Sequence, residues 1–163
     1  MTAMTGDLAV TSATGTVRRL QALMAAGWPP PILAAELHMY RSETARLLRA
    51  RRVIVRTARR VADLYARLWD IHPGTHGATP EAIEQTKARA RAAGWAPATA
   101  WDDDRIDDPT AVPDWTGHCG TVRGAALHDD HDIPLCPPCR GALTRRRLRN
   151  EAHERRALST TRA

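Results

Sequence analysis

Apolar side chains recur three and four residues apart through the first part of the chain, which is the spacing of an amphipathic helix. The most regular stretch runs from residue 55 or 56 to Trp69, where arginines fill much of the opposite face. The same spacing predicts a first helix at residues 17–26. Two further helices are placed after the prolines at 29–31 and after the turn at 38–40, at residues 30–37 and 41–50. We therefore expect a helical bundle over residues 16–70.

The pattern becomes irregular after residue 70. Residues 72–77 form a linker by composition, and Thr79 followed by Pro80 predicts the start of a short helix that reaches residue 93. This helix ends in AAGW, a tetrapeptide that also occurs at residues 25–28. We interpret the repeat as a helix-end signal, because glycine suits the left-handed turn that follows a helix.

An acidic segment lies between the two ends of the chain. Residues 101–114, which contain WDDDRIDDP, are predicted to be an acidic, partly ordered loop. We expect residues 71–117 to be a linker that carries one short helix and this loop. Residues 1–15 and 159–163 are expected to be a disordered N-terminus and a disordered tail.

The net charge of +6 is unevenly distributed. Residues 17–69 hold eleven arginines against three acidic residues, and residues 119–163 hold nine against five. Two basic ends around an acidic middle point to nucleic acid as a partner. The chain has 23 arginines and one lysine, a bias that a GC-rich actinobacterial or phage genome also produces, so charge alone favours DNA only modestly.

Several protein classes do not fit the composition. No window approaches the run of about 18 apolar residues that a membrane span needs, and residues 1–15 lack the basic start and apolar run of a signal peptide. Three cysteines, an odd number, argue against a disulfide framework. We expect a cytoplasmic, nucleoid-associated protein without enzymatic activity and without a membrane partner.

The window PPILAAELHMYRSETARLL, residues 30–48, fits the requirements of a helix-turn-helix. Ala34 is a small residue where two helices cross, and Thr44 suits a position where a β-branched residue usually packs. Apolar residues stand at the four places that hold the helices together, namely Leu33, Leu37, Met39 and Leu47. His38 occupies the turn position that is commonly glycine, and histidine tolerates a left-handed backbone better than most residues.

This window resembles the DNA-binding domain of the lambda repressor and Cro family. The resemblance implies that the second helix of the pair enters the major groove of double-stranded DNA. The residues that would read bases are Tyr40, Arg41, Ser42, Ala45 and Arg46. The residues that would hold phosphates are Arg49, Arg51 and Arg52.

All three cysteines lie within CGTVRGAALHDDHDIPLCPPC, residues 119–139. Cys136 and Cys139 are close enough in sequence to bind one metal ion, and a tetrahedral zinc site needs two more ligands. Cys119 supplies one of them, and His128 and His131 are both well spaced to supply the other. The segment has too few apolar residues for a core of its own, so we expect structural Zn²⁺ to replace that core.

A second resemblance concerns this segment. The spacing C-G-T-x-x-G-x-x-x-H-x7-C-x2-C is similar to small zinc modules of actinobacterial and actinophage proteins. That resemblance implies His128 as the fourth ligand, beside Cys119, Cys136 and Cys139. The sequence after Cys139 turns helical and basic, so the module is expected to cover residues 118–158 and to resemble a treble clef with a C-terminal helix.

A nuclease is a weaker alternative. Residues 130–135, DHDIPL, are similar to a stretch of HNH nucleases, in which a histidine activates water beside a divalent cation. Here His131 would take that role. The nuclease fold needs a further loop and more catalytic residues before its last cysteines, whereas Leu135 runs directly into Cys136.

The expected fold class is mainly α, with a helix-turn-helix bundle followed by a small zinc finger. The expected function is sequence-specific DNA binding by a bacterial or phage transcriptional regulator, which could act as a homodimer. A second hypothesis is an adaptor that binds RNA polymerase or a host factor through the zinc module. The terminal helix carries a basic run that includes Arg145–Arg147. This run either contacts the phosphates of DNA or is simply exposed to solvent, and the sequence does not favour one of these alternatives over the other.

Overall fold

The structure is a computed structural model that describes residues 6–161 and is mainly helical. The chain forms two compact units, Met1–Pro113 and Asp114–Ala163. The regular elements of the first unit are β1 (Val10–Ser12), α2 (Thr14–Ala25), α3 (Pro30–Glu36), α4 (Arg41–Leu47), β2 (Arg52–Ile54), α5 (Val55–Leu68), η1 (Pro73–His76), α6 (Pro80–Ala92) and η2 (Ala98–Ala100). No helix among the described residues is both long and apolar enough to cross a membrane.

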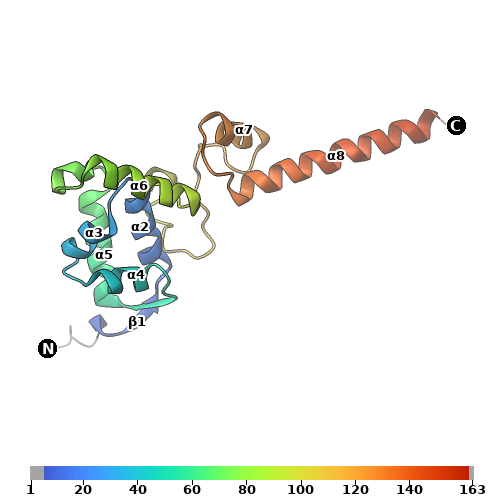
Figure 1. Ribbon diagram of the computed structural model, residues 1–163. Helices are drawn as coiled ribbons and strands as arrows, with labels where there is room; N and C mark the ends of the chain where they lie inside the picture. The colour runs from blue at the N-terminus through green and yellow to red at the C-terminus, as the bar shows by residue number, and fades with distance from the viewer. Residues whose placement is uncertain (1–5, 162–163) are drawn as a thin grey trace. The chain divides into compact units, whose positions relative to one another are not determined.

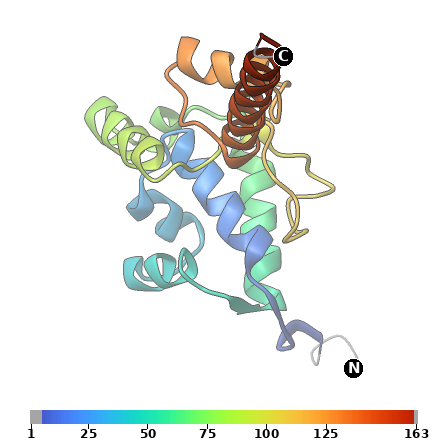
Figure 2. The same cartoon turned by 90° about the vertical axis from the view of Figure 1, so that its right-hand side faces the viewer.

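Helices α2 and α5 pack side by side and form the centre of the first unit (Figure 2). The apolar stripes predicted from the sequence meet here, so Leu20, Leu23, Val61 and Leu64 are almost completely buried. Trp28, which follows α2, is also fully buried in this cluster. The helical periodicity of residues 17–69 is therefore explained by one shared core.

Helices α3 and α4 pack against each other across a short turn. Leu33, Ala34 and Leu37 are buried, while Met39 and Leu47 are partly buried against the main core. These are the positions that the sequence pattern assigned to contact between the two helices.

The AAGW repeat ends two helices in the same way, as predicted. The backbone N–H of Trp28 donates to the carbonyl of Leu23 at 3.0 Å, and that of Trp95 donates to Ala90 at 2.9 Å. The intervening glycines have φ angles of +100° and +68°. This six-to-one bond after a left-handed residue is a Schellman motif, which satisfies the last helical carbonyls.

The N-terminal segment is more ordered than predicted. Residues 10–12 form β1, which pairs antiparallel with β2 in the register Val10↔Ile54. The pairing continues where the Ala13 N–H donates to the carbonyl of Arg51. The prediction of disorder over residues 1–15 is therefore wrong for this part, and residues 1–5 lie outside the described residues. A strand of three residues is too short for its alternation to be recognised in the sequence.

The segment predicted as a linker belongs largely to the first unit. Helix α6 packs against α2, and Ile106 from the acidic loop is fully buried in the main core. The guanidinium of Arg18 donates to the carbonyls of Ile106, Asp108 and Ala111 at 3.0, 2.6 and 2.9 Å. The same group lies 4.5 Å from the ring centroid of Trp101. One apolar side chain and one arginine thus order a loop whose acidic composition suggested solvent exposure.

The second unit consists of α7 (Val122–Asp130), α8 (Pro137–Thr161) and the loops around them. Helix α7 was not predicted from the sequence. Helix α8 begins before Cys139 and includes residues 159–161, so the predicted disordered tail is wrong for these residues. Only the start of α8 packs against α7, and the rest projects from it as a single helix (Figure 1). At 1.5 Å per residue, its 25 residues span about 37 Å.

Candidate metal centre and basic surface of α4

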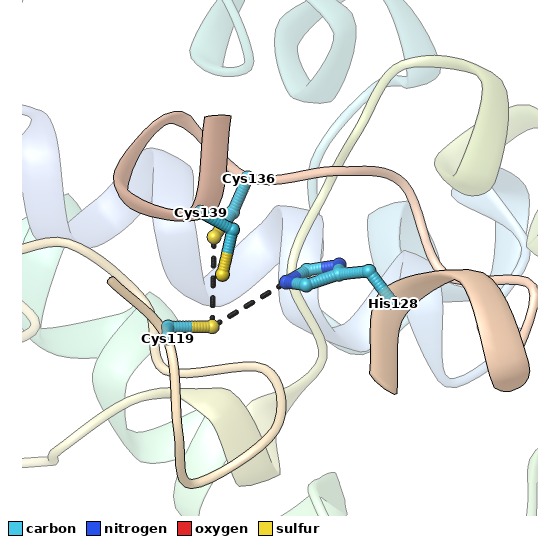
Figure 3. Close-up of side chains that lie close together, drawn as sticks. All are labelled: Cys119, His128, Cys136 and Cys139. Atoms are coloured by element: carbon cyan, nitrogen blue, oxygen red, sulfur yellow. Dashed lines mark hydrogen bonds between the residues drawn. The ribbon is translucent and has the colours of Figure 1, made fainter. Parts of the chain in front are cut away.

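Four side chains of the second unit converge on one point (Figure 3). Cys119 comes from the loop before α7, His128 from α7 itself, Cys136 from the residue just before α8, and Cys139 from the first turn of α8. The four ligand atoms all lie within 4.8 Å of one another. This group could hold a metal ion, and it contains the four ligands that the second resemblance implied.

The distances between the ligand atoms suit tetrahedral coordination. Nε2 of His128 lies 3.4 Å from Sγ of Cys119, and Sγ of Cys136 lies 3.5 Å from the same sulfur. A tetrahedron with metal–sulfur bonds of about 2.3 Å has sulfur–sulfur edges of about 3.8 Å. Disulfide sulfurs lie about 2.05 Å apart, so the three cysteines are free thiols.

Two glycines allow the chain to fold tightly around the sulfurs. Gly120 has a φ of +88°, and its N–H donates to Sγ of Cys139 at 3.4 Å. A Cβ atom on Gly124 would lie 2.2 Å from the carbonyl oxygen of His118. Thr121 caps α7 by accepting from the Gly124 N–H at 2.9 Å, so the start of the helix that carries His128 is fixed against the loop that carries Cys119.

The buried thiol of Cys136 needs a nearby cation to lose its proton. Burial is the largest cause that raises the pKa of the Cys136 thiol to about 12, and hydrogen bonds to the thiols of Cys119 and Cys139 also raise it. Three adjacent thiolates would also repel one another without a counter-charge. A bound metal ion would supply that charge and displace the protons.

His128 has too few partners to be an ordinary core histidine. Its side chain is 1% exposed, and its Nδ1 atom has no hydrogen-bond partner among the described residues. Its Nε2 atom meets only the weakly interacting sulfur of Cys119. A polar ring buried in this way is costly, and coordination through Nε2 would offset the part of the cost that belongs to that atom, whereas Nδ1 would still lack a partner among the described residues. The other candidate, His131, is exposed and lies outside the cluster.

Asp114 fixes the loop before Cys119, a role that the sequence did not indicate. Its Oδ1 accepts from the N–H groups of Thr116 and Cys119 at 3.3 and 3.1 Å. Burial alone would raise the pKa of Asp114, but these hydrogen bonds and one from Gly117 outweigh it, and the pKa is lowered. An aspartate side chain that accepts from the backbone N–H two residues later forms an Asx-turn, which is common in loops. Such a turn does not by itself identify a metal site.

The residues predicted to contact DNA lie on α4 or next to one of its ends, and all are exposed. They are Tyr40, Arg41, Ser42, Ala45, Arg46, Arg49, Arg51 and Arg52. Within residues 6–161, none of their arginines forms an ion pair. The acidic loop forms its ion pairs elsewhere, with Asp107 bound to Arg19 at 2.7 Å. The basic surface of α4 is therefore neither buried nor neutralised.

A groove of about 550 Å³ runs beside α4. Its apolar lining includes Met39, Leu47 and Val53, and Thr57 of α5 also lines it. Four of the eight predicted contact residues line the same groove, namely Ala45, Arg46, Arg49 and Arg52. The sequence placed the first three of these side chains on one helix, but the groove depends on β2, which includes Arg52 and which the sequence did not reveal.

Comparisons with known proteins do not assign the chain to a family. No protein-family model, no curated protein and no solved structure matches it.

Proposed function

We propose that the protein binds double-stranded DNA sequence-specifically and acts as a transcriptional regulator. In this proposal α3 and α4 form a helix-turn-helix, and α4 is the helix that enters the major groove. The observation that carries it is the division of α4 into a buried and a basic side. Thr44 is 1% exposed toward the core, whereas Arg41, Ala45 and Arg46 are exposed.

Tyr40, Arg41 and Ser42 are the first residues of α4 and its N-cap, which in this motif lie closest to base edges. Arg41 and Arg46 are the candidates for paired hydrogen bonds to guanine, the commonest specific contact. Glu43 is the one acidic residue on α4, and its carboxylate accepts from the Tyr40 N–H at 2.8 Å. That hydrogen bond stabilises the start of the helix and keeps the carboxylate close to the backbone.

Arg49, Arg51 and Arg52 follow α4 and are proposed to hold phosphates. Arg49 and Arg52 line the groove beside α4 together with apolar residues and one acidic residue, Glu43. Contacts of this kind fix the register of the protein on DNA without reading its sequence.

For the metal centre we propose structural zinc. Three sulfurs and one imidazole are a common ligand set of closed zinc sites, and soft thiolate ligands disfavour magnesium or calcium. All four ligand positions are taken by the protein, so the site keeps no open position for a substrate. The zinc would hold together a unit whose buried cluster is small, comprising Ala125 and two of the cysteines.

Selection of duplexes from a random pool with the full zinc-loaded chain tests the proposed function. We expect enrichment of one sequence. With that duplex, R41A and R46A should lose most of the preference over a scrambled duplex, because each good guanine contact contributes about 1–3 kcal/mol of discrimination. R51A is the matched control, since it removes the same charge and should weaken both duplexes alike. No enrichment, or equal loss with all three variants, would contradict the proposal.

A further inference from the structure

We propose that α8 carries a second DNA-contacting surface, which binds the phosphate backbone without reading sequence. This inference rests on the proposed function, because it takes double-stranded DNA as the partner of the chain. It concerns the second unit, whereas the proposed reading helix α4 belongs to the first.

Charge in the second unit is separated between the metal module and the helix. Helix α8 has seven arginines and two glutamates, whereas residues 114–136 have one arginine and four aspartates. The excess of positive charge on α8 favours binding of a polyanion. The negative charge of residues 114–136 argues against DNA contact by that part of the unit.

The arginines of α8 are arranged in a face. Arg145, Arg149, His153 and Arg156 follow one another at spacings of four, four and three, and Arg146 lies three before Arg149. Residues at these spacings share one side of a helix. We call this set the basic face of α8, and it contains no acidic residue.

Both glutamates lie on the opposite side. Glu151 is four residues after Arg147 and pairs with it at 3.7 Å, and Glu154 lies three residues further on. Arg155 is four residues after Glu151 and shares that side. The positive charge of the opposite side is therefore reduced by its own acids, whereas Arg145, Arg146 and Arg149 of the basic face form no ion pair within residues 6–161.

The apolar residues of α8 do not form a surface for a helical partner. Leu143, Leu148 and Leu158 are exposed by 40%, 52% and 69%, but they are five and ten residues apart. A coiled-coil partner needs apolar residues every three and four positions. The phosphate backbone is the occupant that the charge pattern favours, and from Arg145 to Arg156 the basic face spans about 16 Å, alongside about ten phosphate charges of a duplex.

The salt dependence of binding tests this inference with two matched variants. R146Q/R149Q removes two charges from the basic face, and R147Q/R155Q removes two charges from the opposite side. Arg145 is left in place because it donates to the carbonyl of Gly120 at 3.2 Å. Zinc content and thermal unfolding of each full chain establish that both variants are folded.

Binding is measured with the selected duplex, flanked by base pairs of arbitrary sequence, across a range of salt concentrations. For R146Q/R149Q we expect the slope of log K against log salt to fall by about two, because each phosphate contact contributes about 0.9. The preference for the selected sequence should not change. R147Q/R155Q should change the slope by less than half as much.

The outcomes separate this inference from the proposed function. Equal slopes for both variants and the unaltered chain overturn the inference while leaving binding by α4 intact. Equal reductions in both variants also overturn it, because a general charge effect needs no basic face. If the unaltered chain binds no duplex but a single-stranded nucleic acid or an acidic polypeptide binds α8, the proposed function and the DNA partner fail together.

Discussion

Nε2 of His128 lies 3.4 Å from Sγ of Cys119, although nine residues separate them in sequence. The contact exists because α7 turns the histidine back toward the loop that precedes the helix. We predict that H128A reduces bound zinc from about one equivalent per chain to less than half, because three sulfurs leave the tetrahedron incomplete. Metal analysis of the purified protein measures this.

H131A is the matched control for that variant, since it removes an imidazole three residues away that is exposed. It should retain a full equivalent of zinc. Retention of zinc by H128A together with its loss from H131A would reverse the assignment of the fourth ligand. H131A also tests the nuclease alternative, which requires magnesium-dependent cleavage of DNA that this substitution abolishes.

A second prediction concerns the close contact at the start of α7. In G124A the new Cβ would lie 2.2 Å from the carbonyl oxygen of His118, so the loop or the helix must shift. We expect at least a tenfold loss of zinc affinity in a chelator competition, because the shift separates Cys119 from His128. G141A is the control, because there the Cβ meets only the end of the Arg145 side chain at 3.2 Å, and alanine favours a helix. Unchanged affinity in G124A would contradict this account of the glycine.

A third prediction tests whether the acidic loop is part of the first unit. Ile106 is fully buried among core residues, so I106A should lower the free energy of unfolding by about 2–5 kcal/mol. Val112 is 61% exposed, and V112A should change the stability by less than about 0.5 kcal/mol. Denaturant unfolding of both variants decides between a docked loop and a free linker. If the segment were a free linker, both substitutions would have similarly small effects.

A fourth prediction follows from the ion pair between Asp107 and Arg19. The hydrogen bond from Arg19 is the largest cause that lowers the pKa of Asp107 below its ordinary value. A carboxylate whose pKa is lower in the folded state stabilises the fold above its unfolded pKa of about 3.9, and this contribution disappears as the pH falls through the folded value. Because Asp107 is 67% exposed, we expect D107N to lower the stability at pH 7 by no more than about 1 kcal/mol.

The difference between D107N and the unaltered chain should shrink as the pH is lowered from about 5 to 3. D104N removes the same charge from an exposed residue without an ion pair in the described chain, so it controls for the general effect of net charge. A difference for D107N that is constant over this pH range would show that the carboxylate does not contribute through its ionised form.

The sequence was most informative at residue types that occur in few local conformations or have few alternative roles. Helical spacing predicted α2 and α5, and prolines and turn residues predicted where α3 and α4 begin. Thr79 and Pro80 predicted the start of α6, and the glycines of AAGW predicted two helix ends. The metal ligands were predictable because thiols and imidazoles have few other reasons to cluster. His128 was separated from His131 by a resemblance, and the structure supplies the physical reason, which is burial on α7.

The sequence was least informative where distant residues decide the outcome. Strands β1 and β2 are three residues each and are stable only because they pair with each other. The acidic loop is ordered because Arg18, about 90 residues earlier, satisfies its carbonyls. Helix α7 has nine residues and little apolar periodicity, so its formation depends on the Thr121 cap and on the cluster that it completes. Such contacts cannot be recognised from local spacing.

The last prediction concerns the turn between α3 and α4. The Met39 N–H donates to the carbonyl of Ala34 at 2.9 Å, which is the same six-to-one bond that follows Gly27 and Gly94. Here the left-handed position is His38, with a φ of +48°. A side chain in this region costs about 1–2 kcal/mol, and glycine avoids that cost but has more freedom in the unfolded chain.

H38G should therefore raise the free energy of unfolding by about 0.5–1 kcal/mol, whereas H38V should lower it by about 1–2 kcal/mol, because a β-branched side chain is least tolerated at positive φ. His38 is exposed, so neither change removes a buried contact. Denaturant unfolding measures both. If the turn positions α4 for DNA, H38G should keep the affinity for the selected duplex, and H38V should weaken it beyond its effect on the folded fraction. Destabilisation by H38G would mean that the histidine makes an interaction which outweighs the strain of its backbone.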